Sequence, residues 1–343
     1  MANSPTKILL IYTGGTIGMV KDYDTGALKA FNFNKLEKKI PELGQLDCSI
    51  DSVSFKEPLD SSNMDPGHWV KIAGLIEEHY ERYEGFVVLH GSDTMSYTAS
   101  ALSYMLEHLR KPVVLTGSQL PIGDLRTDAK ENLITAIQVA SLQERGRPVI
   151  QEVCLYFEYK LYRGNRTTKI NAEHFEAFAS LNYPPLAESG VHLKVSYDAL
   201  YRGSRRKGLL VHKDLDTNVA ILKLFPGLNR EVLTSVLNIP GLKGLVLETY
   251  GAGNAPTQPW FVNALKEAIE RGVKVVNVTQ CSGGSVLMGQ YETSEALREI
   301  QIISGADITT EAAITKLMYL LGNKVSAKSF KTIFETSLRG EMS

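Results

Sequence analysis

The sequence predicts an α/β protein: a larger N-terminal domain with a mainly parallel sheet and flanking helices, followed by a smaller α/β C-terminal domain. Short β-branched runs alternate with longer amphipathic ones, which is typical of βαβ units. The chain has 343 residues, which exceeds the length that a single hydrophobic core usually stabilises. We therefore expect an N-terminal domain at 1–190, a linker at 191–213 and a C-terminal domain at 214–343.

The elements of the first domain follow from the spacing of its apolar residues. Asp65 before Pro66 is typical of a helix start, since aspartate caps the first turn and proline needs no hydrogen-bond acceptor there. An apolar stripe with helical spacing predicts a second helix: Met95, Ala99, Leu102, Leu106 and Leu109. The predicted strands are 7–13, 86–90, 112–116 and 153–157.

A polar, basic and glycine-bounded stretch, YRGSRRKG at 201–208, interrupts this pattern and supports the predicted linker. The alternation of strands and helices then resumes, which predicts the smaller second domain. Its expected strands are 219–224, 244–250 and 273–279, and its expected helices are 259–271 and 309–321.

Composition excludes several classes of function. The chain is 43% hydrophobic with a net charge of -1, so no large positive field is available for nucleic acid or anionic lipid. No run approaches the roughly 20 apolar residues of a membrane span, and the start of the chain lacks a signal-peptide pattern. The cysteines Cys48, Cys154 and Cys281 have neither disulfide nor zinc spacing. We expect a cytoplasmic protein that needs no metal and no cofactor.

Polar, glycine-rich turns follow three of the predicted strands. Their sequences are TGGTIG at 13–18, HGSDT at 90–94 and TGSQ at 116–119. The ligand crevice of a parallel sheet lies beyond the carboxyl ends of its strands, and glycines let the backbone approach a ligand there. This layout suits a hydroxyl nucleophile acting on a small molecule.

Simple bending and nucleotide binding compete with catalysis as interpretations of the first turn. For an isolated G-G-x-x-G, a bend that the glycines permit is the favoured interpretation. A dinucleotide fingerprint would need glycine where Thr13 stands, and no G-K-[ST] is present for a phosphate loop. A threonine nucleophile needs a proton acceptor and oxyanion donors. Asp93, beside Ser92, could supply a carboxylate, and Lys169 could supply an amine. The spacing of these residues along the chain does not by itself show that they meet.

Two further residues favour a structural interpretation. His90 ends a buried strand and has no second histidine at metal-ligand spacing, so we interpret it as a hydrogen-bonded core histidine. Cys281 ends a strand of the second domain, and we expect a small buried residue there rather than a nucleophile.

Six motifs match one family in its order along nearly the whole chain. They are YTGGTIG (12–18), DSSNM (60–64), HGSDTM (90–95), LYRGNRTTK (161–169), YGAGNAP (250–256) and LRGE (338–341). The chain resembles the L-asparaginases, and within them the cytoplasmic type I enzymes. The resemblance implies hydrolysis of L-asparagine to L-aspartate and ammonia through a threonyl acyl-enzyme. A weak activity on glutamine stays open.

The resemblance also implies catalytic residues. Thr16, rather than Thr13, corresponds to the nucleophile that attacks the side-chain amide. A second catalytic group, in which a hydroxyl, a carboxylate and an ammonium relay a proton or activate water, corresponds to Ser92, Asp93 and Lys169.

Substrate-binding residues follow in the same way. Ser61, Ser62 and Asn63 correspond to groups that hold the α-carboxylate and α-amino groups of the amino acid. Asn254 corresponds to an asparagine that family members lend to a neighbouring subunit's site, which implies a homodimer or homotetramer.

The chain departs from the family pattern at three positions. Ser92 stands where the family usually has threonine, which keeps the hydroxyl. Many members have a tyrosine beyond the nucleophile, but this register reaches Ala27, so Tyr23 is the candidate substitute in a lid at 21–29. Glu248 stands where asparagine-regulated relatives have arginine, and a carboxylate would repel the effector's own.

Two further classes of function remain to be weighed. An amino-acid sensor would keep the crevice but has no use for a threonine, aspartate and lysine set, so the enzyme is favoured. An ammonia-generating subunit for glutamyl-tRNA usually carries an extra nucleic-acid-facing domain, and none is visible in this sequence.

Overall fold

The computed structural model describes residues 5–21, 28–30, 40–203, 208–289 and 292–343. The chain divides into two compact units. Unit 1 comprises Met1–Ser180 and Pro184–Lys213, and unit 2 comprises Leu181–Tyr183 and Asp214–Ser343. The larger unit 1 and the smaller unit 2 are both α/β, as the sequence predicts.

Unit 1 is built on an eight-stranded sheet with the strand order β15-β14-β11-β10-β7-β5-β1-β4. The neighbours from β10 to β4 all pair in parallel, whereas β11, β14 and β15 pair antiparallel. The parallel strands are β1 (Thr6–Gly14), β4 (Cys48–Leu59), β5 (Gly85–Leu89), β7 (Val113–Thr116) and β10 (Val153–Phe157). The four predicted strands are confirmed, each to within one residue at either end.

The fifth parallel strand, β4, is not predicted by the sequence pattern. Most of its side chains are exposed or half-buried, and it pairs with β1 at one edge of the sheet. Edge strands need no continuous apolar run, because only part of their surface packs on the core. The strand is still important for the site, since the Ser61 turn follows it directly.

Helices α2 (Pro66–His79), α3 (Met95–Met105) and α4 (Ala129–Ser141) flank the sheet. The start of α2 is as predicted, with the Asp65 side chain accepting the amide of His68. Helix α3 ends before Leu106, so the predicted stripe through Leu109 runs too far. Leu106 instead begins the short strand β6 (Leu106–Glu107), where it pairs with Val211.

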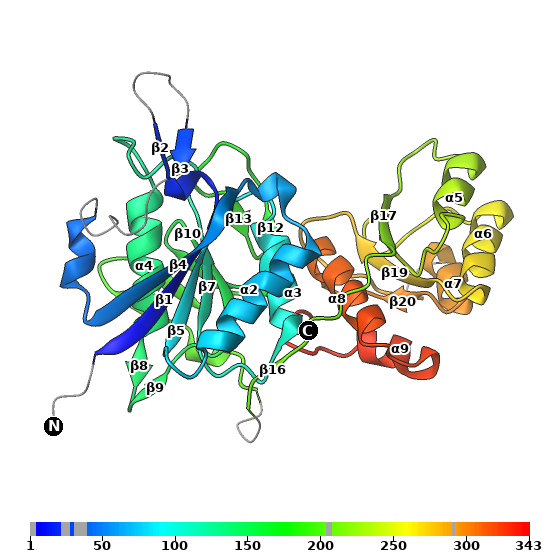
Figure 1. The fold of residues 1–343 in the computed structure, drawn as a ribbon. Coiled ribbons are helices and arrows are strands. Elements are labelled where there is room, and N and C mark those ends of the chain that lie inside the picture. The colour runs from blue at the N-terminus through cyan, green and yellow to red at the C-terminus, as the bar shows by residue number, and fades with distance from the viewer. Residues whose placement is uncertain (1–4, 22–27, 31–39, 204–207, 290–291) are drawn as a thin grey trace. The chain divides into compact units, whose positions relative to one another are not determined.

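The crossovers of unit 1 differ in hand. The connections β5–α3–β7 and β7–α4–β10 step in the same direction along the strand order. Figure 1 shows α3 and α4 on opposite faces of the sheet. One of the two crossovers is therefore left-handed, whereas about 98% of such connections are right-handed. The β7–α4 loop, which carries Gln119, belongs to the second of these two connections.

The segment 191–213, for which the sequence predicts a linker, contains paired strands. Strand β15 (Leu193–Val195) pairs with β14 (Ala187–Ser189), and β16 (Leu210–Val211) pairs with β6. Buried Glu152 also accepts the amide of Tyr201 at 2.7 Å. The segment groups with unit 1 for these reasons, and its residues 204–207 lie outside the described part of the chain.

Unit 2 has a parallel sheet in the order β17-β18-β19-β20, with helices on both faces (Figure 1). Its strands are β17 (Val219–Lys223), β18 (Gly244–Thr249), β19 (Lys274–Thr279) and β20 (Ile303–Ser304). Its helices are α5 (Arg230–Leu237), α6 (Pro259–Glu270), α7 (Glu292–Glu299), α8 (Thr310–Gly322) and α9 (Ala327–Phe334). The elements predicted for the second domain are confirmed to within one residue. Leucines of β17, β18 and α5 pack with Phe261 in one core.

A tight hairpin joins β10 to β11 (Lys160–Arg163) through Glu158 and Tyr159. Both residues have positive φ, 42° and 66°, as two-residue hairpins of this kind require. Burial is the main cause that raises the pKa of Glu158 from 4.5 to about 7, and the carboxylates of Asp128, Glu131 and Glu176 add to it.

We expect Glu158 to make stability depend on pH. Because its pKa is higher in the folded chain, its contribution is fully present below pH 4.5 and is lost as pH rises through about 7. Glu158→Gln should therefore raise the melting temperature at pH 8 more than at pH 5. Glu188→Gln, on the exposed side of β14, is the matched control and should change neither value. An unchanged pH dependence in Glu158→Gln would contradict the raised pKa.

Candidate functional site

The first glycine-rich turn separates its two threonines. The Thr13 hydroxyl is buried and donates to the Leu89 carbonyl at 2.9 Å, which ties β1 to β5. Gly14 and Gly15 then adopt positive φ values of 139° and 83° and reverse the chain. Thr16 follows in a short 3-10 helix and is only half-buried. The Thr13 hydroxyl therefore has a structural role in the core, whereas a ligand can reach the half-buried Thr16.

Three turns pack backbone against backbone beside Thr16. A side-chain carbon added to Gly15 would lie 2.4 Å from the Gly91 nitrogen, and one added to Gly91 would lie 2.5 Å from the Ser61 Oγ. The Thr94 hydroxyl donates to the Ser61 carbonyl at 2.8 Å. These contacts join the turns after β1, β4 and β5 at the carboxyl edge of the sheet, where the sequence predicts a crevice.

The Asp60–Asn63 turn presents hydroxyls at this edge. Asp60 accepts both the amide and the hydroxyl of Ser62 at 2.8 Å, and these hydrogen bonds hold the pKa of its carboxyl below the ordinary value. Ser61 is buried, whereas Ser62 and Asn63 are exposed. The turn therefore offers one packed hydroxyl and two groups that solvent or a ligand can reach.

Lys169 links the turn after β5 to a distant segment. Its Nζ donates to the Ser92 Oγ at 2.8 Å and to the Asp93 Oδ1 at 2.7 Å. The lysine is positioned by β12 (Thr168–Lys169), which pairs with β13 (Phe178–Ala179), and its side chain is 18% exposed. The ammonium that the sequence indicates thus lies within hydrogen-bond distance of both the hydroxyl and the carboxylate.

Gln119 supports this cluster, a role that the sequence does not reveal. The Ser92 hydroxyl lies 3.4 Å from its Oε1, while its Nε2 donates to the carbonyls of Ala172 and His174. Asp128 in turn accepts the amides of Gln119 and Leu120. The one sequence signal for this role is the position of Gln119 in the turn after β7.

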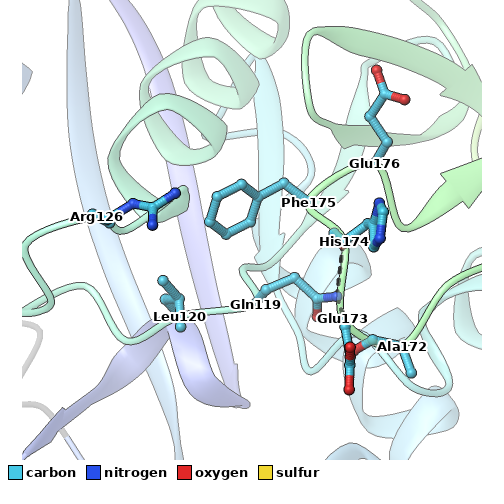
Figure 2. Close-up of a pocket in the computed structure, with 8 residues that line it drawn as sticks. All are labelled: Gln119, Leu120, Arg126, Ala172, Glu173, His174, Phe175 and Glu176. Carbon is cyan, nitrogen blue, oxygen red and sulfur yellow. Dashed lines mark hydrogen bonds between the residues drawn. The ribbon is translucent and has the colours of Figure 1, made fainter.

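A cavity of about 690 Å³ lies next to Gln119 (Figure 2). In Figure 2 the Phe175 ring points toward Arg126, and Glu173, His174 and Glu176 come from the same loop as the ring. The cavity is lined by Gln119, Leu120, Arg126, Ala172, Glu173, His174, Phe175 and Glu176. Gln119 is therefore shared between this cavity and the cluster around Ser92.

The remaining predicted residues belong to unit 2 or fall outside the described residues. Asn254 is in unit 2, after β18, where its backbone bridges to that of Tyr250. Glu248 accepts the Thr310 hydroxyl at 2.7 Å. Cys281 is exposed rather than buried, because it follows β19 in a polar turn. Tyr23 lies outside the described residues.

Two family models match most of the chain. The family model described as "Asparaginase, N-terminal" matches residues 7–201, and that described as "Glutaminase/Asparaginase C-terminal domain" matches residues 218–334. Within the described ranges, no helix is long and apolar enough to span a bilayer.

Individual relatives match this chain over nearly its whole length. L-asparaginase 1 of Escherichia coli K12 is 42% identical, with 98% of this chain and 97% of that protein covered. The 60 kDa lysophospholipase of Mus musculus is 40% identical over 98% of this chain, which spans 62% of its length. The crystal structure of L-asparaginase I from Vibrio cholerae is 40% identical and superimposes with a TM-score of 0.90, covering 99% of this chain and 100% of that one. The protein therefore belongs to the asparaginase family.

Proposed function

We propose that the protein hydrolyses L-asparagine to L-aspartate and ammonia. The observation that carries this proposal is the contact of the Lys169 ammonium with both the Ser92 hydroxyl and the Asp93 carboxylate. A mere binding site for an amino acid has no need of such a cluster. Membership of the asparaginase family supports the same reaction.

Thr16 is the proposed nucleophile. Its Oγ attacks the side-chain amide carbon, and the hydroxyl proton passes to a basic group of the site. The resulting oxyanion is stabilised by backbone N–H groups of the glycine-rich turns. When the intermediate collapses, that proton passes to the amide nitrogen, the C–N bond breaks, ammonia leaves, and a β-aspartyl ester remains on Thr16.

Ser92, Asp93 and Lys169 are the proposed second catalytic group. The ammonium favours negative charge on the Ser92 oxygen, while the carboxylate holds the ammonium in place. The group takes a proton from water, the hydroxide attacks the ester carbon, and the Thr16–acyl bond breaks to release aspartate. Tyr23 is the proposed partner of Thr16 in the lid.

The substrate's α-groups are assigned to the turn after β4. Ser61, Ser62 and Asn63 bind the α-carboxylate and α-amino groups in this proposal. Asp60 supports them, because its carboxylate holds the Ser62 amide and hydroxyl in one geometry. Fixing these groups orients the side-chain amide toward Thr16, which is how such contacts lower the barrier.

Assembly and location complete the proposal. Asn254 contributes to the site of a neighbouring subunit, which makes the working enzyme a homodimer or homotetramer. Catalysis needs neither metal nor cofactor, since the nucleophile and the proton relay are side chains. The enzyme acts in the cytoplasm on a small molecule, without nucleic acid or membrane as a partner.

Ammonia release tests the proposed reaction. The amides to be tested are asparagine, glutamine and short asparaginyl peptides. A lysophospholipid is tested separately for fatty-acid release, because one relative is named a lysophospholipase. Asparagine should be the best substrate, with glutamine weaker by the roughly 10- to 200-fold that one methylene provides. No fatty acid should leave the lysophospholipid. Absence of ammonia from every amide would favour a sensor instead.

A further inference from the structure

A continuous chain of hydrogen bonds runs through the core behind the site. The Trp69 indole on α2 donates to the Thr98 Oγ1 on α3 at 3.0 Å. The Thr98 Oγ1 lies 2.9 Å from the His90 Nε2, and the His90 Nδ1 lies 2.6 Å from the Gly91 carbonyl oxygen. Thr98 and His90 are fully buried, and Trp69 is nearly so.

The two ends of this chain determine its direction. An indole N–H can only donate and a backbone carbonyl can only accept. Because the Gly91 carbonyl needs a donor, the proton of the neutral ring lies on the Nδ1, which leaves the Nε2 to accept the Thr98 hydroxyl; the Thr98 oxygen can accept the Trp69 indole at the same time. Burial lowers the pKa of His90 to about 4, which keeps the ring neutral in this tautomer at physiological pH.

The Gly91 carbonyl that accepts this hydrogen bond lies where the turns of the site pack closely together. Gly91 is the residue against which Gly15 and Ser61 pack. Its C=O belongs to the peptide unit that also contains the Ser92 N–H, and this unit is planar. Holding the carbonyl oxygen therefore sets the orientation of the peptide from which the side chain of Ser92 departs toward Lys169.

We propose that His90 is a positioning residue, and that the Trp69–Thr98–His90 chain fixes the Gly91–Ser92 peptide so that Ser92 and Asp93 meet Lys169. The inference rests on the proposed function for its kinetic consequence. It gives a role to a histidine outside the proposed substrate contacts, and to a tryptophan and a threonine from α2 and α3, two helices that contact each other.

Kinetics of paired variants separates positioning from packing. Thr98→Val keeps the shape but removes the hydroxyl, and kcat should fall roughly 10-fold at nearly constant KM, since misplacement of a reacting group costs rate. Thr98→Ser restores the hydroxyl and should recover most of kcat. Trp69→Phe should give a smaller loss, while Trp260→Phe, the other tryptophan, should give none.

The tautomer can be measured directly. The ¹⁵N chemical shifts of the His90 ring, assigned by comparison with His90→Asn, should show a neutral Nδ1–H form from pH 6 to 9. His90→Asn, whose amide can replace the Nδ1 donor, should keep more activity than His90→Gln. An Nε2–H tautomer, or a Thr98→Val enzyme with wild-type kcat, would overturn the proposal.

Two failures remain distinguishable. If the wild-type enzyme releases no ammonia from any amide, the proposed function fails, whereas the ring shifts still test the hydrogen-bond chain. If Thr98→Val does not fold, the kcat of Trp69→Phe and the ¹⁵N shifts of the His90 ring test the inference instead. A wild-type enzyme that is active, with variants that lose only stability, would reduce His90 to a packing role and contradict the inference.

Discussion

Thr16→Ala should lower kcat for asparagine by roughly 10⁴-fold or more, because no other group can form the acyl ester. Binding should survive, since the proposed contacts to the α-groups come from the turn after β4. The measurement is ammonia release under saturating asparagine, with calorimetry for the affinity. A Thr16→Ala enzyme with substantial turnover would remove Thr16 from the mechanism.

Thr13→Val is the matched control for this variant. It removes the same kind of hydroxyl three residues earlier, where the structure gives the oxygen a purely structural bond to Leu89. It should lower the unfolding free energy by about 1–3 kcal/mol, the usual cost of removing one partner of a buried hydrogen bond, and should lower kcat far less than Thr16→Ala does. Lys169→Met should instead slow deacylation of the acyl-enzyme. A burst of ammonia should then precede a slow steady state, and mass spectrometry should detect an aspartyl adduct on the enzyme.

Lys316→Met should destabilise unit 2 by about 3–5 kcal/mol, the usual cost of breaking a buried ion pair from one side. Lys316 and Glu341 are both fully buried and form an ion pair. The ammonium also donates to the carbonyls of Phe334 and Thr336, at 2.7 and 2.8 Å. Removing the ammonium leaves the buried Glu341 carboxylate without its counter-ion and leaves the two carbonyls without this donor. Denaturant unfolding, monitored by Trp260 fluorescence, measures the loss.

Two controls accompany this variant. Lys328→Met, at an exposed position in α9, should change the free energy of unfolding little. Lys316→Met combined with Glu341→Gln should be more stable than Lys316→Met alone, because the unpaired buried charge is then gone while an acceptor for the amides of the turn remains. A single variant as stable as wild type would show that the pair does not hold the C-terminal segment.

This ion pair gives a physical role to one motif that the sequence presents only as a family signature. The Glu341 carboxylate accepts the amides of Leu338 and Arg339 as well as Lys316. The LRGE motif therefore forms a closed turn around a carboxylate that reaches into the core of unit 2. Spacing cannot reveal this, because Lys316 lies on α8 and the turn is built from backbone amides.

Periodicity predicts the elements whose packing is regular. Strands buried on both faces follow from residue order alone, as do the helices of the second domain, and the bounds predicted for them agree with the structure to within one residue. The prediction fails where packing is one-sided or where pairing overrides pattern. The exposed strand β4 has no apolar run to reveal it, and Leu106 leaves the helix to pair with Val211 in a strand.

The candidate site divides in the same way. Residue types and the family motifs predict Ser92, Asp93 and Lys169, but Lys169 is far from the other two along the chain, and only the fold brings its ammonium to them. Gln119 and Asp128 have no clear sequence signal, because their roles depend on backbone groups of distant segments. The three residues of the hydrogen-bond chain come from α2, α3 and the turn after β5.

By itself, the sequence determined the α/β class, most of the buried parallel strands, the family and the chemical types at the site. These properties depend on local periodicity and on motifs that each lie within a few residues. The tertiary structure alone decided which of Thr13 and Thr16 is buried, which groups Lys169 contacts and which hydrogen-bond partners the His90 ring has. Hydrogen bonds and burial join residues distant in sequence, and their geometry exists only once the sheet and its helices have packed.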